Sequence, residues 1–288
     1  MRDKKQKRQK KDTTMIMANP YIIPNNNRIH SNPSKRKIAL DMLERYTGSP
    51  PRKFGKQIIL TNFSYYLDRF HQLCGNERTR GSIMGVVHDS KNDVSIVDFS
   101  IGAPTAALII ELLATLNPTA VLLLGMCGGL HRSLKIGDFI LPTAAIRDEG
   151  ASKHFMPAQV PALPTFKIQK FVSQILVERN MDYRTGVVHT TDYRFWEFDQ
   201  KFQAQLHYER VLAIEMETAT FFIAGFASKV PIGALLLVSD LPLTRGGIKT
   251  KKSAQAVFRQ FTDTHLEVGM KAMSEIAERG EHIRHYRW

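Results

Sequence analysis

Three carboxylates near two predicted strand ends are the side chains best suited to chemistry. Glu215 and Glu217 follow the short apolar run 211–214, after which apolar residues recur at helical spacing. Asp240 ends a second apolar run, 233–238. Ligands of open α/β sheets bind at the carboxyl edge of the strands, so we expect these side chains to lie at such an edge. Carboxyl groups placed there can transfer protons or hold hydroxyl groups.

Each of these carboxylates also has a purely structural interpretation. Acidic residues favour the first turn of a helix because they complement the helix dipole, and this would explain Glu215 and Glu217. Asp240 precedes Leu-Pro and could simply begin a turn. The spacing alone therefore leaves a structural and a functional role open.

A glycine-rich stretch follows the continuous apolar run 119–124, which predicts a buried strand. Gly125, Gly128 and Gly129 would allow backbone N–H groups to approach an anion or a sugar oxygen closely. Tight packing at a turn explains them equally well. The spacing does not match the dinucleotide-binding fingerprint.

Two further stretches suit a nucleotide ligand. Arg194 and Trp196 follow the predicted strand 183–191, so an aromatic ring could stack on a base while the cation pairs with a phosphate. The alternative is a surface arginine above packed aromatic side chains. Segment 241–249 contains two glycines and is typical of a mobile lid over Asp240.

Composition limits the possible classes of protein. The 288 residues suit one large α/β domain with an appendage, and 43% hydrophobic residues can fill a core. No apolar run is long enough to span a membrane. Cys74 and Cys127 make no disulfide framework, so we expect a reducing, cytoplasmic location. No Cys/His spacing predicts a metal site, and no cofactor is expected.

The net charge of +13 is partly concentrated at the start of the chain. Seven Lys and Arg residues and only two Asp residues occur in the first fourteen positions, and no apolar segment follows that would make a signal peptide. We interpret residues 1–33 as a basic, mostly disordered arm, with nucleic-acid binding as the less favoured alternative. The remaining positive charge suits an anionic small substrate.

Composition and periodicity divide the rest of the chain into a helical lead-in, 34–56, one large folded domain, 57–278, and a basic tail, 279–288. Within the domain it predicts alternating strands and helices. The predicted strands are 57–60, 82–87, 94–99, 119–124, 139–146, 183–191, 211–214 and 233–238. The predicted helices are 34–46, 65–73, 102–116, 164–180, one beginning near Glu215, and 253–276.

Several motifs, in the expected order, resemble the nucleoside phosphorylase and nucleosidase superfamily, and within it most of all the AMP nucleosidases. The resemblance covers residues 57–278. The motifs are Thr61-Asn-Phe63, Gly125-Met-Cys-Gly-Gly129, the stretch 136–150, Val160-Pro-Ala-Leu-Pro164, Thr190-Thr-Asp-Tyr-Arg-Phe-Trp-Glu197, Ala213-Ile-Glu-Met-Glu217 and Val238-Ser-Asp240. The larger AMP nucleosidases carry an additional N-terminal domain, for which this chain is too short.

The resemblance implies a three-layer α/β/α fold around a mixed, partly closed sheet. It implies hydrolysis of the N-glycosidic bond of AMP to adenine and ribose 5-phosphate, through an oxocarbenium-like state. Asp240 would protonate the purine N7, which requires a raised pKa. Glu217 would bind the ribose hydroxyls, with Met216 packing on the sugar.

The resemblance also implies which residues contact the rest of the substrate. Arg147, Arg194 and Lys249 are the candidates for the 5′-phosphate. The residue that orients water is not identified by the sequence. Further substrate contacts are expected from four residues: Asn62, Gly128, Trp196 and Ser239.

The attacking group is the main point of difference from the phosphorylases. In those relatives a glycine turn and two arginines grip inorganic phosphate, and Asn62, Tyr66 and Leu123 stand in the corresponding places here. Loss of both arginines favours water as the attacking group.

Two alternatives stay open. The first is a phosphorylase or nucleosidase that acts on unphosphorylated nucleosides. The second, of another class, is a non-catalytic protein that binds nucleotides or nucleic acid. Relatives complete their sites with a neighbouring subunit, so a homo-oligomer is expected, with a hexamer as the expected size.

Overall fold

A computed structural model describes residues 32–74 and 77–279. Within them, nine strands form one mixed sheet in the order β2-β3-β4-β1-β5-β8-β7-β6-β9. The bounds are β1 Gln57–Thr61, β2 Arg78–Arg80, β3 Gly85–Asp89, β4 Val94–Asp98, β5 Ala120–Gly129, β6 Phe139–Asp148, β7 Tyr183–Thr191, β8 Ala213–Glu215 and β9 Ile232–Asp240.

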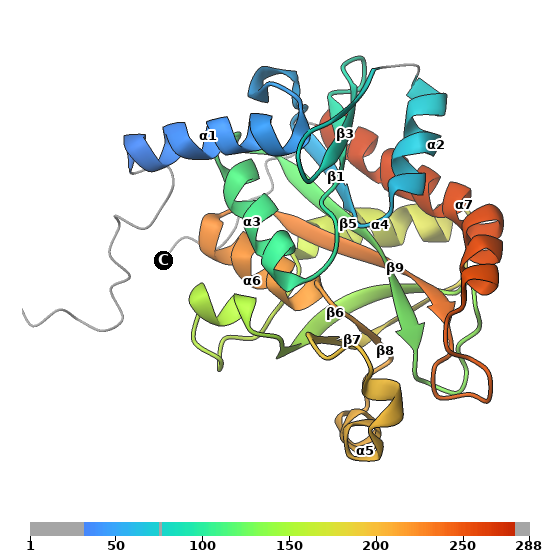
Figure 1. Cartoon of the computed structure of the whole chain (residues 1–288). Helices are drawn as coiled ribbons and strands as arrows, with labels where there is room; N and C mark the ends of the chain where they lie inside the picture. The colour runs from blue at the N-terminus through green and yellow to red at the C-terminus, as the bar shows by residue number, and fades with distance from the viewer. Residues whose placement is uncertain (1–31, 75–76, 280–288) are drawn as a thin grey trace, which may run out of the picture.

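The second half of the sheet closes on itself. β9 pairs with β6 and also, in parallel, with β5, so that β5, β8, β7, β6 and β9 form a closed ring. Figure 1 shows β5 and β9 crossing the middle of the molecule, with β6, β7 and β8 below them. The prediction of a mixed, partly closed sheet is confirmed.

The glycines after residue 124 lie inside β5, so the prediction that they follow the strand is wrong. β5 continues because Gly125 pairs with Leu236 of β9 and Gly128 pairs with Ile214 of β8. A Cβ at Gly129 would stand 2.9 Å from a Val238 methyl carbon. Ring closure therefore requires small residues here, which is a packing role that the local pattern could not separate from a turn.

Helices cover both faces of the sheet (Figure 1). On one face lie α1 Pro33–Thr47, α3 Ala103–Ala114 and α6 Thr218–Ser228, which share one apolar cluster with the strands. On the other lie α2 Ser64–Cys74, α4 Phe166–Glu178 and α7 Lys251–Glu278, which share a second cluster. The predicted three-layer architecture is confirmed.

The predicted elements are all present, with ends that differ by a few residues, whereas β2 and α5 Gln200–Glu209 were not predicted. α5 has only one buried residue, Leu206, so its sequence lacks an apolar stripe.

The helical lead-in 34–56 contains α1 and the short 3₁₀ turn Pro51–Lys53. The predicted basic arm and tail lie almost wholly outside the described residues. No helix among the described residues is long and apolar enough to cross a membrane.

Candidate active site

The chain brings the predicted carboxylates to one edge of the sheet. β1, β5 and β9 run parallel, so their carboxyl ends lie on the same side. Gly128, near the end of β5, pairs with Ile214 on one flank and with Asp240 on the other. Glu215 therefore ends β8, which runs antiparallel to β5 on one flank, with Glu217 two residues further on, and Asp240 ends β9 on the other flank.

Glu215 is tied into the backbone of the following helix. Its Oε2 accepts from the N–H groups of Glu217 and Thr218, both at 2.7 Å, at the beginning of α6. Its Oε1 accepts from the hydroxyl of Thr190 on β7, which in turn accepts from the N–H of Ala219. Burial raises the pKa of Glu215, but these donors favour its charged form. Glu215 is thus a helix cap, as its structural interpretation predicted.

Glu217 has a different environment, although it lies only two residues away. Its side chain is 5% exposed, and Oε1 accepts from the N–H of Gly102 at 2.7 Å. Oε2 has one weak contact, with Asn62 Nδ2 at 3.5 Å. Burial, reinforced by the charge of Glu215, raises the pKa of Glu217 to about 8. Of the two glutamates, Glu215 therefore has the donors that favour a charged form, whereas Glu217 has one strong donor and one weak one.

Asp240 ends β9 at the rim of the site. Ser239 donates its hydroxyl to Asp240 Oδ1 at 2.7 Å, and Lys249 Nζ lies 4.0 Å from the same oxygen. Burial raises the pKa of Asp240, against the opposing effect of the Lys249 ammonium group. Burial, together with the charges of Glu215 and Asp240, raises the pKa of the Cys127 thiol on β5.

Lys249 and Arg194 both lower the pKa of Asp240 by their charge. Lys249 pairs with Asp240 and lies 5.8 Å from the ring centre of Phe63. The Arg194 side chain is 54% exposed, pairs with Glu197 at 2.8 Å, and helps to lower the pKa of Asp240. Both cations thus act on the charge of the proposed acid, and their pairing with a 5′-phosphate stays a prediction.

The guanidinium group of Arg147 is bonded to its own loop rather than directed into the site. Its guanidinium donates to the carbonyl oxygens of Met156, Pro157 and Val160 and to the hydroxyl of Ser152. These bonds fold the loop after β6 onto its strand. A phosphate could reach Arg147 only by displacing them, so we leave it out of the proposed substrate contacts.

Trp196 lies in a small apolar cluster with Leu206, Val211 and Ile214, and it is only 4% exposed. Its ring is therefore core, which is the structural alternative named for it. The exposed aromatic side chains beside Arg194 are Tyr193 and Phe195, at 45% and 68%. Met216 is partly exposed between the two glutamates, as a sugar contact must be.

Two groups at the site escaped the sequence analysis. The N–H of Gly102 grips Glu217, and the hydroxyl of Thr190 grips Glu215, although both residues are far away in the chain. A glycine just before Ala-Pro-Thr is consistent with the positive φ of Gly102, +96°. No sequence signal indicates that Gly102 contacts Glu217. No group of three or more His, Cys, Asp or Glu side chains within 32–74 and 77–279 could hold a metal ion.

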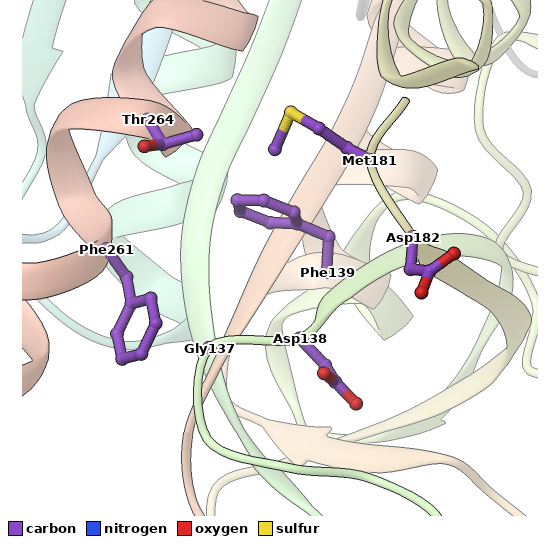
Figure 2. A pocket seen from close by; sticks show the side chains of 7 residues that line it. All are labelled: Gly137, Asp138, Phe139, Met181, Asp182, Phe261 and Thr264. Carbon is purple, nitrogen blue, oxygen red and sulfur yellow. The ribbon is translucent and has the colours of Figure 1, made fainter. Parts of the chain in front are cut away.

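A separate surface hollow of about 270 Å³ lies outside the site. Figure 2 shows Phe139, Met181 and Phe261 around it, with Asp138 and Asp182 at its mouth. It shares no lining residue with the carboxylate edge, although Asp138 accepts a backbone bond from Val238 of β9. We place the chemistry at the carboxylates because geometry and raised pKa values coincide there.

Comparison with known proteins agrees with this fold. The phosphorylase superfamily model matches residues 58–277. The crystal structure of an AMP nucleosidase from Bacteroides thetaiotaomicron superposes with a TM-score of 0.76 at 36% identity, over 85% of this chain and 98% of that one. A purine nucleoside phosphorylase from Toxoplasma gondii, at 18% identity and TM-score 0.70, shares the fold over 80% of this chain and 95% of its own.

Among curated proteins, the AMP nucleosidase of Escherichia coli (strain K12) is 28% identical over 299 aligned positions, which cover 88% of this chain and 62% of the relative. The chain thus spans less than two thirds of the length of that relative. Because the superfamily model covers most of its length and a solved AMP nucleosidase matches nearly end to end, the chain belongs to the phosphorylase superfamily and resembles the AMP nucleosidases within it.

Proposed function

We propose that this protein hydrolyses the N-glycosidic bond of AMP, releasing adenine and ribose 5-phosphate. The likeness to two AMP nucleosidases supports the reaction. The observation that carries the proposal is the Asp240 carboxyl, held by Ser239 and buried enough to have a raised pKa, across β5 from Glu217.

Asp240 serves as the general acid. As the C1′–N9 bond breaks, its electron pair moves onto the purine, and the proton of Asp240 goes to N7. Lys249, 4.0 Å away, then faces the carboxylate that Asp240 becomes, and the ammonium group stabilises that charge. Serine 239 fixes the carboxyl group by donating to one oxygen, which leaves the other free for the base.

Glu217 serves at the sugar. One oxygen is fixed by the Gly102 N–H, and the other has only the weak contact with Asn62. That oxygen is available for a ribose hydroxyl. Positive charge grows on the sugar as the base leaves, so the charged form of Glu217 is stabilised in the transition state more than in the free protein.

Water, rather than phosphate, is the proposed attacking group. Tyr66 is fully buried, and its hydroxyl donates to His265 Nδ1 at 2.8 Å, because His265 Nε2 donates to the Leu235 carbonyl. Leu123 is 2% exposed within β5. Neither can grip an anion, and each stands where the phosphorylase relatives place an arginine.

The test is incubation with AMP, adenosine and IMP, each with and without inorganic phosphate, followed by identification of both products. We expect adenine and ribose 5-phosphate from AMP without added phosphate. A ribose 1-phosphate-type product that forms only when phosphate is present would establish a phosphorylase instead. Preference for adenosine over AMP would establish a nucleosidase for unphosphorylated substrates.

We also propose a homo-oligomer, expected to be a hexamer, on the basis of the superfamily resemblance. The exposed aromatics Tyr193, Phe195 and Phe198 beside the site, the last at 76%, are suited to burial by a second copy. Light scattering measures the mass directly. A monomer at working concentration would contradict this part of the proposal.

A further inference from the structure

The amide of Asn62 makes only half of its possible hydrogen bonds at the site. Asn62 follows β1 at the edge where β5 and β9 also end. Its Nδ2 faces Glu217 Oε2 at 3.5 Å. Its Oδ1 is buried and has no partner among the described residues. An unpaired buried acceptor costs roughly 1–3 kcal/mol, so the position favours a ligand that donates a hydrogen bond.

The surroundings of Asn62 select a neutral donor. Four residues further on, the Tyr66 hydroxyl is committed to His265, and Leu123 of the neighbouring strand is apolar. No lysine or arginine has a described hydrogen bond or ion pair with Asn62 or Glu217. A phosphate dianion would find no compensating charge beside Asn62, whereas an O–H group needs only an acceptor.

We propose that Asn62 Oδ1 accepts a hydrogen bond from the attacking water and holds that water against the sugar. This inference rests on the proposed hydrolysis of AMP and supplies its missing water-orienting residue. With Asn62 Nδ2 toward Glu217, Oδ1 is directed away from the carboxylate.

The step balances in atoms and charge. The C1′–N9 electron pair leaves with adenine, which takes the proton of Asp240. A lone pair of the water forms the new C1′–O bond. The proton that this water releases passes to solvent, and Asp240 later regains its own proton from solvent. Asn62 itself gains and loses no proton.

A ribose hydroxyl is the other O–H group that could donate a hydrogen bond to Asn62 Oδ1. The experiment distinguishes a ribose hydroxyl from water. AMP is turned over in water containing methanol, and the ratio of methyl ribose 5-phosphate to ribose 5-phosphate is measured. A protein that holds one water excludes methanol, so the wild type should give almost only ribose 5-phosphate. Asn62→Ala should lower turnover on the order of 10²-fold and raise the methanol share at least about tenfold.

The matched control is Tyr66→Phe, which removes one buried hydroxyl from the same segment without touching the site. It should leave the product ratio unchanged. Turnover of 2′-deoxy-AMP and 3′-deoxy-AMP tests the hydroxyl alternative. If Asn62 binds water, Asn62→Ala should lower turnover by the same factor for AMP, 2′-deoxy-AMP and 3′-deoxy-AMP.

Three outcomes would overturn the inference. They are an unchanged product ratio in Asn62→Ala, a penalty that vanishes on one deoxy substrate, and a wild type that forms methyl ribose 5-phosphate in proportion to methanol. The last needs no variant and holds even if Asn62→Ala fails to fold. If the wild type releases no adenine from AMP at all, the proposed function fails, which is a different result from hydrolysis with an unchanged ratio.

Discussion

The β8–α6 junction and the end of β9 each deliver carboxyl groups to the site, but they hold them in different ways. At the junction, Glu215 and Glu217 are 6% and 5% exposed, and both contact main-chain N–H groups. At the end of β9, the Asp240 side chain is 15% exposed and pairs with Lys249, which is 26% exposed on the following segment. The carboxyl groups of the junction are therefore buried in the core, whereas Asp240 lies at the partly exposed rim of the site.

This difference matches the demands of the two proposed roles. Sugar hydroxyls must be held in a fixed position throughout the reaction, which suits a carboxyl anchored to Gly102. A proton donor must be recharged between turnovers, which requires access to solvent. Asp240 has that access, and the segment 241–249 beside it has its own turn bonds from Thr244 and Gly247 rather than strand pairing.

The largest expected effect is at the rim. Asp240→Asn should bind AMP but lose about 10²–10⁴-fold in kcat, because an amide of the same shape cannot deliver a proton to N7. Release of adenine under saturating AMP measures this. Asp138→Asn, at the separate hollow, is the control and should stay near wild type. Near wild-type turnover by Asp240→Asn would show that another group is the acid.

At the junction, Glu217→Gln should weaken binding and turnover together, because Glu217 contacts sugar hydroxyls before and during bond breaking. Loss of a charged hydrogen bond of roughly 1.5–3 kcal/mol corresponds to about 10- to 150-fold in kcat/KM. Steady-state kinetics with AMP separate KM from kcat. A change in kcat alone would contradict a contact made in the ground state.

Stability should also distinguish the two glutamates. Because burial raises the pKa of Glu217 to about 8, the folded protein binds one more proton than the unfolded chain between about pH 4.5 and pH 8. The free energy of unfolding should therefore fall as pH rises through that window. Glu217→Gln should remove this loss and stabilise the ligand-free protein at pH 8, by on the order of a few kcal/mol.

Glu215→Gln is the companion variant. It removes the charge that helps to raise the pKa of Glu217, so the fall in unfolding free energy between the two pH values should become smaller than in wild type. Denaturant titrations at pH 5 and pH 8 measure both variants. Equal pH dependence in wild type and Glu217→Gln would show that Glu217 does not hold the proton.

A smaller effect is expected from Lys249→Met. Turnover of the wild type should fall at high pH as Asp240 loses its proton, and that limb should vanish in Asp240→Asn. Lys249 lowers the pKa of Asp240, so its removal should move the limb to higher pH, by up to about one unit for a partly exposed pair. A pH profile of kcat/KM measures the shift. A shift of the high-pH limb to lower pH would contradict the pairing of Lys249 with Asp240.

The smallest effect is expected from removal of residues 1–14, which have no apolar periodicity and cannot cover a core face. Turnover should change by less than about twofold, because no catalytic group is assigned there. Activity and thermal unfolding of the shortened chain measure this. A large loss of folded protein would show that the arm is structural.

Sequence patterns located most elements because burial imposes a period on them. The strand 183–191 was predicted with the bounds that β7 has, and the amphipathic α4 differs by two residues at each end. α5 was missed because it buries only Leu206, and the end of β5 was misplaced because glycine usually interrupts strands. Ring closure with β8 and β9, which no local window contains, continues β5 through its glycines.

The sequence by itself determined the chemistry available at this edge, since it placed Glu215, Glu217 and Asp240 at strand ends. Only the tertiary structure decided the surroundings of each carboxyl group. Glu215 meets the first N–H groups of α6, whereas Glu217 meets Gly102 and Asn62 from distant segments. Protonation depends on burial and on neighbouring donors, and those are set by contacts between residues more than a hundred positions apart rather than by residue type.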